Sequence, residues 1–413
     1  MESKQKFVII LILGLLSAVG PFSIDMYLPG FPAIADDLNT SVDMVSYSLA
    51  SFFIGISFGQ LICGPLLDRF GRKIPLLVGL GIYILASIGC ALTTSIEALI
   101  FLRLFQALGG CVGMVAPRAI VRDIFPINEN AKIFSLLILI LGVSPILAPT
   151  VGSYTIAALG WHSVFVILSV MAGLVTVAVI FWLPESKQPD PTFSLKPKPI
   201  LLSFFTVLRH PQFYTYALTG AVASAGLFAY LSGSPFVFMQ LYGVSEQQYG
   251  WIFALIASGL ITCSQLNIIL LKKYSSETIM YAILILQTSI GILLFAGTTF
   301  DILGLYGTIV LIFLFLSCQG FSFPNSSALS MAPFSAEAGS ASALMGGIQM
   351  ALGSLAAALV GFLNARTALP MTGVMAGCTL LGLVILLVGS RKIKHTAKVE
   401  DVEAQALDLI EKY

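Results

Sequence analysis

The sequence predicts an all-α polytopic membrane protein, in which twelve transmembrane helices form two pseudo-symmetric six-helix bundles. Composition, the number of apolar runs and the distribution of basic residues support this prediction. Of the 413 residues, 57% are hydrophobic and only 10% are charged, and the mean hydropathy is +0.96. Soluble domains carry about 25% charged residues, so this chain has too few charges to cover a soluble surface of its size.

Twelve apolar runs are each long enough to cross a bilayer, which takes about 20 residues. The first run follows Lys4 and Lys6, but it is too long for the apolar region of a signal peptide and has no clear small-residue cleavage site, so we expect a retained span. The twelve predicted spans cover residues 7–28, 44–66, 74–93, 98–118, 132–155, 162–183, 212–236, 249–271, 278–297, 303–323, 338–363 and 367–389.

Basic residues predict the orientation, because cytoplasmic loops carry an excess of lysine and arginine. If the N-terminus is cytoplasmic, all of the 21 lysines and arginines except Arg103 and Arg366 lie in cytoplasmic segments. We therefore expect a multi-pass protein of the bacterial inner (cytoplasmic) membrane with both termini in the cytoplasm.

A long polar stretch separates the sixth and seventh spans. Its first part is rich in proline and predicts an extended linker. Its second part can form a short amphipathic helix on the membrane surface, with Arg209 and His210 facing water, or belong to an ordinary solvated linker. The tail is interpreted as a surface helix or a frayed end. The predicted parts are a first bundle, a cytoplasmic linker, a second bundle and a tail, at residues 1–183, 184–211, 212–389 and 390–413.

Several other functions are not supported by the sequence. The net charge is only +1 and no basic tract lies outside the loops, so no nucleic-acid partner is expected. No phosphate-binding G-x-x-x-x-G-K-[ST] string is present, which disfavours an ATP-driven pump. The cysteines are scattered singly in apolar runs, so we expect neither disulfides nor a metal site. They are Cys63, Cys90, Cys111, Cys263, Cys318 and Cys378.

The segment between the second and third spans concentrates charge and glycine in ten residues. It could pair Asp68 with Arg72 and with the end of a neighbouring helix, and so act as a conformational gate. Alternatively, its basic residues only enforce topology. The predicted gate residues are Gly64, Asp68, Arg69, Gly71, Arg72 and Lys73.

These ten residues reproduce in full the loop signature G-x-L-x-D-R-x-G-R-K of the major facilitator superfamily. Together with motifs in the first, fourth and fifth spans, they resemble the twelve-span drug:proton antiporter branch and, within it, the bicyclomycin-resistance (Bcr/CflA) subfamily. The second half matches only by span count and a few polar residues, and its copy of the loop signature has decayed to Leu271-Lys272-Lys273-Tyr274. The span motifs are Ser23–Pro32, Leu99-x-x-x-Arg103-x-x-Gln106-x-x-Gly109, and Gly142, Pro145, Pro149 and Gly152.

The resemblance implies the major facilitator fold, a gating role for the loop and a fifth span that accompanies export. The glycines and prolines of that span also predict a bent, small-residue face that permits close helix contact.

Two charges lie at hydrocarbon depth within the predicted spans and are the candidates for proton coupling. A charge at a helix centre costs about 2.5–3.5 kcal/mol on insertion scales, so Asp25 and Arg103 are expected to be functional. Asp25 could instead cap the outer chain end or accept a bond from Tyr27 or a nearby amide. Arg103 could help Asp25 ionise, act as a fixed charge that repels the proton, or snorkel to backbone carbonyls. The resemblance ties the span-four arginine to proton coupling.

Polar side chains within the spans suggest a cavity with polar points and apolar walls. Each one taken singly is explained as well by a helix–helix hydrogen bond. Weak internal repetition makes Gln106 of the fourth span the counterpart of Gln319 of the tenth. The candidates for the substrate cavity are Tyr27, Gln106, Tyr230, Gln240, Gln319 and Asn325.

The sequence therefore predicts a secondary active transporter that exports small amphipathic drug-like compounds in exchange for protons. We expect a monomer in the lipid bilayer that needs no cofactor, because the proton gradient drives it. Two alternatives stay open. One is a proton-coupled importer of a small nutrient. The other is a polytopic membrane enzyme, which should show clustered Asp, His or Cys at one membrane face.

Overall fold

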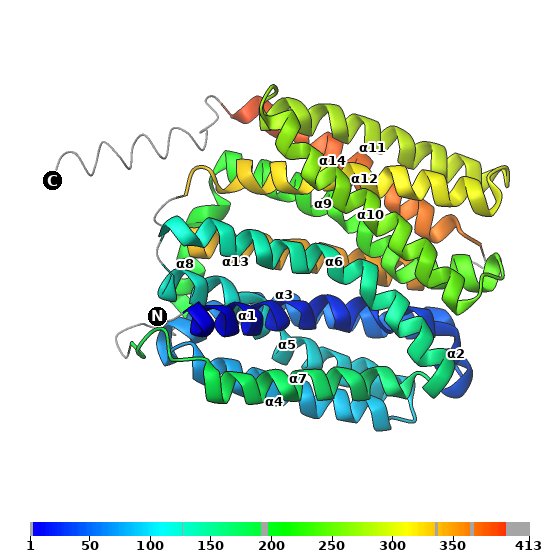
Figure 1. The fold of residues 1–413 in the computed structure, drawn as a ribbon. Coiled ribbons are helices and arrows are strands. Elements are labelled where there is room, and N and C mark those ends of the chain that lie inside the picture. The colour runs from blue at the N-terminus through cyan, green and yellow to red at the C-terminus, as the bar shows by residue number, and fades with distance from the viewer. Residues whose placement is uncertain (1–2, 126, 191–196, 335–337, 364–366, 394–413) are drawn as a thin grey trace. The chain divides into compact units, whose positions relative to one another are not determined.

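The computed structural model describes residues 3–125, 127–190, 197–334, 338–363 and 367–393 (Figure 1). Within these ranges the chain is helical and has no strand, and twelve helices are long and apolar enough to cross a membrane. The all-α prediction with twelve spans is thus confirmed. The α-helices are α1 Ser3–Asp25, α2 Phe31–Asp37, α3 Val42–Phe70, α4 Lys73–Leu92, α5 Ile96–Ile124, α6 Ile127–Leu159, α7 His162–Trp182, α8 Pro197–Leu208, α9 Pro211–Pro235, α10 Glu246–Leu271, α11 Ser276–Thr299, α12 Gly304–Met331, α13 Ala338–Leu363 and α14 Leu369–Gly389.

Three short segments complete the described elements. A 3₁₀ turn, η1 (Leu28–Gly30), links α1 to α2, and another, η3 (Ser390–Lys392), follows α14. A π-helical turn, η2 (Phe236–Leu241), continues α9 beyond Pro235. The greater part of the predicted tail, residues 394–413, lies outside the described residues.

Several helices extend beyond the apolar runs that predicted them. Helix α3 begins after Ser41, whose hydroxyl accepts a hydrogen bond from Met44 N at 3.2 Å, and it ends at Phe70. A prediction from hydropathy ends where the first polar residues begin. A capped helix continues through those residues, because its backbone hydrogen bonds do not depend on apolar side chains. Most of the charged segment between the second and third spans is therefore helical, and only Gly71 and Arg72 form the turn.

The chain divides into two compact units, which we describe separately. Unit 1 comprises Met1–Leu195, Leu231–Leu255 and Val360–Thr367, and unit 2 comprises Lys196–Tyr230, Ile256–Leu359 and Ala368–Tyr413. In unit 1, α5 packs against α1, α3 and α4, and α7 packs against α1 and α4. In unit 2, α11 packs against α12 and α14. The division of the sequence at residues 183 and 212 stays a prediction.

One close approach depends on the lack of a side chain at Gly152 of α6. A Cβ at this position would overlap the carbonyl oxygen of Met26, the residue directly after α1. Small residues let helix backbones come this near. The Gly–Pro segment of α6 therefore rests on the turn that follows Asp25.

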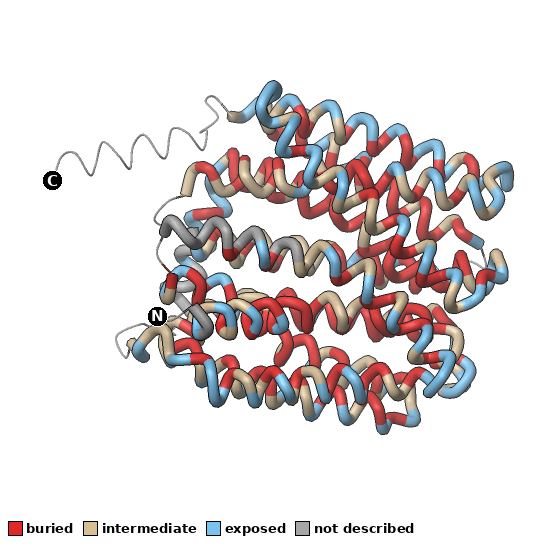
Figure 2. The backbone as a smooth tube through the Cα atoms, in the orientation of Figure 1, coloured by how far each residue is buried: buried red, intermediate tan, exposed pale blue. Residues whose placement is uncertain are grey.

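Burial follows stripes along the helices, and the opposite faces are exposed and apolar (Figure 2). Leu85 and Leu92 of α4 are 72% and 76% exposed, and Phe181 of α7 is 73% exposed. A soluble protein rarely exposes contiguous apolar surface on this scale, whereas lipid tails solvate such side chains well. These faces are suited to contact with the bilayer.

Candidate functional site

A buried cluster in unit 1 surrounds the guanidinium of Arg103, which has no exposed surface. Arg103 Nη1 donates to Gln106 Oε1 at 2.6 Å, and Nη2 donates to the carbonyl oxygen of Ser23 at 3.0 Å. Within the described residues, Nε has no hydrogen-bond partner and no ion pair joins Arg103 to a carboxylate. The positive charge is therefore held by neutral groups.

Aromatic rings form the rest of the Arg103 environment. The guanidinium carbon lies 4.1 Å from the ring centroid of Phe52, 4.4 Å from that of Tyr27 and 5.8 Å from that of Phe165. Ring faces attract cations, and desolvation strengthens this attraction to about 2 kcal/mol. The predicted cavity residues Tyr27 and Gln106 thus both belong to the Arg103 cluster.

Hydrogen bonds extend the Arg103 cluster to α4. Gln106 Nε2 donates to Ser87 Oγ at 2.7 Å, and Ser87 Oγ in turn donates to the carbonyl oxygen of Tyr83 at 2.7 Å. The Tyr83 hydroxyl returns to α1 through a bond of 2.6 Å with Ser23 Oγ. Helices α1, α4 and α5 are therefore tied together by one polar network.

Asp25 is the last residue of α1 and is 5% exposed. Among the described residues its carboxylate makes no hydrogen bond and no ion pair, so neither a bond from Tyr27 nor a backbone cap is present. Arg103 reaches α1 two residues earlier, at Ser23.

A second polar cluster lies in unit 2 and centres on Gln319 of α12. Gln319 Nε2 donates to Ser224 Oγ of α9 at 2.5 Å, and Gln319 Oε1 accepts from Gln287 Nε2 of α11 at 3.1 Å. The glutamines at 106 and 319 thus occupy similar settings, because each links the helix that carries it to a polar side chain of the preceding span.

The other predicted cavity residues are not brought together. Asn325 donates from Nδ2 to Asn267 Oδ1 at 2.7 Å and to the carbonyl oxygen of Phe321 at 2.8 Å. Tyr230 is buried in α9, whereas Gln240 is exposed in η2. These side chains therefore do not line a single described cavity.

The turn between α3 and α4 holds a cluster of charged groups. Arg72 donates from Nη1 to Asp68 Oδ1 at 3.0 Å and from Nε to Asp123 Oδ2 at 2.7 Å, at the end of α5. Burial alone lowers the pKa of Arg72, but its bonds with Asp123 and Asp68 outweigh this effect and raise the pKa above the ordinary value. Arg72 thus joins the ends of α3 and α5.

The segment after α7 binds to this turn, and we call residues 184–190 the strap. Glu185 accepts hydrogen bonds from the backbone amides of Arg72 at 2.7 Å and Lys73 at 3.1 Å. Lys187 Nζ donates to Asp68 Oδ1 at 2.7 Å. The backbone amide of Asp190 donates to the carbonyl oxygen of Arg69, and Arg69 Nη1 donates to the carbonyl oxygen of Asp190.

Sequence analysis missed Asp123, Glu185 and Lys187 because they are distant in sequence from the groups that they bind. Asp123 lies 51 residues beyond Arg72, and the strap lies more than 110 residues beyond the turn. A weak signal was present, since α4 begins without an acidic residue in its first turn or a capping side chain of its own. The first backbone amides of a helix have no partner within the helix and favour a nearby carboxylate. Glu185 supplies this carboxylate to α4.

The remaining predicted gate and span-five residues have distinct settings. Lys73 Nζ donates to the carbonyl oxygen of Ile180 in α7 at 2.8 Å. Gly71 has φ of +80° and its missing Cβ faces Glu185, whereas a Cβ at Gly64 would meet nothing within 4 Å. In α6, Pro149 and Gly152 are buried, and Gly142 and Pro145 are half-buried.

Comparison with known proteins identifies the family. A family model described as Major Facilitator Superfamily matches residues 13–358. The chain belongs to the Major Facilitator Superfamily. It is therefore a transporter, and the enzyme alternative does not hold.

Relatives extend over nearly the whole chain. An uncharacterized MFS-type transporter of Bacillus subtilis, YdgK, is 34% identical over 92% of this chain and 94% of its own length. The bicyclomycin resistance protein homolog of Haemophilus influenzae is 30% identical over 95% of this chain and 99% of its own length. Multidrug resistance protein MdtL of Escherichia coli O127:H6 is 30% identical over 89% of this chain and 92% of its own length. The resemblance recognised from the span motifs is confirmed.

A solved structure confirms the major facilitator fold. The crystal structure of a D-xylose-proton symporter aligns with a TM-score of 0.71, over 95% of this chain and 98% of that one, at 15% sequence identity. At this identity the match concerns the fold alone.

Proposed function

We propose that this member of the Major Facilitator Superfamily exports small amphipathic drug-like compounds in exchange for protons. The observation that carries the proposal is Asp25, a carboxylate that is 5% exposed and has no hydrogen-bond or ion-pair partner among the described residues. Desolvation makes a buried, unpaired charge costly, and protonation removes that cost. Such a group can bind a proton in one state of the carrier and release it in another.

Arg103 serves in this proposal as a fixed positive charge close to the proton site. A guanidinium stays protonated, so Arg103 cannot carry the transported proton itself. Its bond to Ser23 O connects it to the end of α1, two residues before Asp25. Movement of α1 would therefore change the field that Arg103 exerts on the carboxylate.

The names of two relatives, a bicyclomycin resistance protein homolog and a multidrug resistance protein, support export of drug-like compounds. We further propose a monomer in the bacterial inner membrane with both termini in the cytoplasm, as the basic residues of the loops predict. Small-molecule substrate and protons are then its only ligands, and no cofactor is needed.

The first test is Asp25→Asn, which keeps the shape of the side chain but cannot exchange a proton. We expect this variant to lose efflux against a gradient in everted vesicles while its expression and folding stay normal. Asp36→Asn is the matched control, because Asp36 lies on α2 and is exposed. Substrates for the assay come from a drug-susceptibility panel measured with and without expression and with a protonophore.

Three outcomes would count against this proposal. Wild-type pumping by Asp25→Asn would remove the carboxylate from coupling. Resistance that persists after a protonophore collapses the gradient would argue against antiport. Proton-dependent accumulation of the compound inside expressing cells would instead support the importer alternative.

A further inference from the structure

Helix α8 is docked by one apolar face on an end of unit 2. This inner face packs on the start of α9, the end of α12 with the residues after it, and the start of α13, which are all membrane-spanning helices. Spanning helices begin and end at the border of the bilayer, so α8 lies at that border. The buried members of the contact are Val207, Phe213, Ala217, Ala341 and Leu344, and the half-buried ones are Phe204, Met331, Phe334, Met345 and Ile348.

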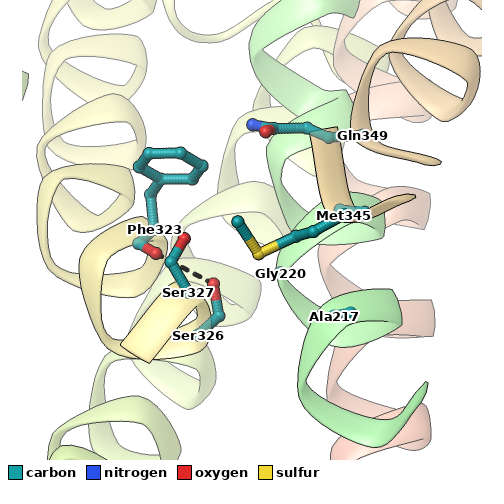
Figure 3. A pocket seen from close by; sticks show the side chains of 8 residues that line it. Ala217, Gly220, Phe323, Ser326, Ser327, Met345 and Gln349 are labelled. Atoms are coloured by element: carbon teal, nitrogen blue, oxygen red, sulfur yellow. Dashed lines mark hydrogen bonds between the residues drawn. The ribbon is translucent and has the colours of Figure 1, made fainter. Parts of the chain in front are cut away.

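The packing that receives α8 leaves little free space. Ala217 of α9 and Met345 of α13 also border a cavity between α9, α12 and α13 (Figure 3). This cavity measures about 10 Å³, which is room for about one water molecule. The sulfur of Met345 accepts a hydrogen bond from Ser330 Oγ at 3.2 Å, which fixes that side chain. The inner face of α8 therefore rests on a filled core, and only its outer face is open to a ligand.

The outer face of α8 is apolar but exposed. Leu202, Phe205 and Leu208 are 56%, 51% and 38% exposed. Residues three apart lie on one side of a helix, and the exposed residue Arg209 follows them directly. We call these four residues the outer stripe. Exposed apolar side chains beside a basic residue are typical of helices that lie in the membrane interface.

Arg209 gives the outer stripe a positive charge. Its guanidinium carbon lies 4.2 Å from the centroid of the Phe205 ring, and its backbone amide donates to the carbonyl oxygen of Phe205 at 3.1 Å. No carboxylate among the described residues forms an ion pair with it. A planar guanidinium with several donors suits the oxygens of a phosphate group. The stripe thus holds a positioned charge that can accept an anion.

The surrounding sequence also favours an anionic partner in the bilayer. Residues 191–245 contain no Asp or Glu, and their lysines and arginines are Lys196, Lys198 and Arg209. Basic residues next to a membrane span attract anionic lipids, and this attraction falls off within a Debye length. Arg209 lies two residues before Pro211, where the spanning helix α9 begins. It is therefore close enough to reach the lipid headgroups.

We propose that the outer stripe of α8 binds an anionic phospholipid at the membrane surface. Its leucines and phenylalanine would enter the apolar edge of the bilayer, and the guanidinium of Arg209 would bind the lipid phosphate. In the proposed orientation this is the cytoplasmic leaflet. The proposal favours the amphipathic helix over the solvated linker as the interpretation of this segment. The binding involves no substrate and no transported proton, so it is independent of the proposed export function.

Native mass spectrometry of the purified full-length protein measures the binding of single lipids. Phosphatidylglycerol, which carries a net negative charge, is the probe, and phosphatidylcholine with the same acyl chains is the zwitterionic comparison. We expect phosphatidylglycerol to bind more tightly. Arg209→Gln should weaken it about fivefold, the contribution of one basic residue near an anionic surface, whereas Arg209→Lys should retain most of the preference. Lys272→Gln, at an exposed position after α10, is the matched control and should leave the affinity nearly unchanged.

A nitroxide attached to Leu202→Cys reports the depth of the outer stripe in nanodiscs. With phosphatidylglycerol present, we expect the label to be more accessible to oxygen, which dissolves in the bilayer, than to a water-soluble nickel complex. This preference should decrease in phosphatidylcholine alone and after Arg209→Gln. A label on Lys273→Cys, at an exposed position after α10, should favour the nickel complex in either lipid. The native cysteines are buried or half-buried, and the unsubstituted protein gives their background signal.

Three results would overturn the inference. The first is equal affinity for the two lipids, and the second is an equal loss of affinity in Arg209→Gln and Lys272→Gln. The third is a label at position 202 that favours the nickel complex even with phosphatidylglycerol, which would leave the stripe in water and open to a protein partner. Normal elution in size-exclusion chromatography establishes that each variant is folded. Neither assay uses a proton gradient, so failure here is distinct from failure of the Asp25→Asn experiment.

Discussion

At the scale of single residues, Arg103 combines a full charge with complete burial and only neutral partners. Removing a charge from water without an opposite charge beside it is costly to the folded state. Stability alone therefore gives little reason for an arginine at this position. The bonds to Gln106 and Ser23 instead favour a role in the transport cycle.

This argument predicts that Arg103→Met loses transport but keeps, or slightly raises, the unfolding temperature. Arg103→Lys should also lose at least tenfold in transport rate, because an ammonium cannot reproduce the planar, multi-donor geometry that reaches Gln106 and Ser23 together. Thermal unfolding in detergent and efflux from everted vesicles measure the two effects. Normal transport by either variant would show that the guanidinium serves the structure alone.

The sequence identified Arg103, Asp25 and Gln106 because charges and amides stand out within apolar runs. It did not predict their surroundings. The carbonyl oxygen of Ser23 is a backbone group, which every residue type provides, and phenylalanines such as Phe52 are common throughout the spans. Residue types at a buried site can thus be predicted, whereas partners that depend on helix rotation cannot.

At the scale of elements, the α3–α4 turn depends on a carboxylate from outside its own sequence. Glu185 bonds to the first amides of α4, which has no capping side chain of its own. Gly71 makes this possible, because a Cβ there would lie 3.0 Å from Glu185 Oε2 and from the carbonyl oxygen of Lys187. The charged string and the strap therefore form one element.

Two glycines of the same string provide a matched pair of variants. Gly71→Ala should lower the unfolding free energy by about 1–3 kcal/mol, since a positive φ is strained for alanine and the new methyl group displaces Glu185. Gly64→Ala should be neutral or stabilising, because α3 is helical there and nothing lies within 4 Å of the added carbon. Thermal unfolding compares them, and equal losses in both variants would contradict this account.

At the scale of the whole molecule, hydropathy predicted how many membrane-spanning helices the described residues contain and approximately where they lie. It placed several helix ends too early, as in α12, which continues to Met331 rather than stopping near residue 323. It also suggested that Gln106 and Gln319 correspond. The structure adds that each bonds to a polar side chain of the preceding span, Ser87 and Gln287. Pairings of this kind depend on packing that composition does not encode.

The strap also has a genetic consequence, because it decides where the gene can be divided. Residues 184–190 follow the sixth membrane span but bind to the α3–α4 turn, so they belong with the first fragment of a split chain. Co-expressed fragments separated after Asp190 should accumulate and complement one another better than fragments separated after Leu183. Immunoblots of membranes and drug-susceptibility tests would compare the pairs. Equal performance would mean that the strap contributes little to assembly.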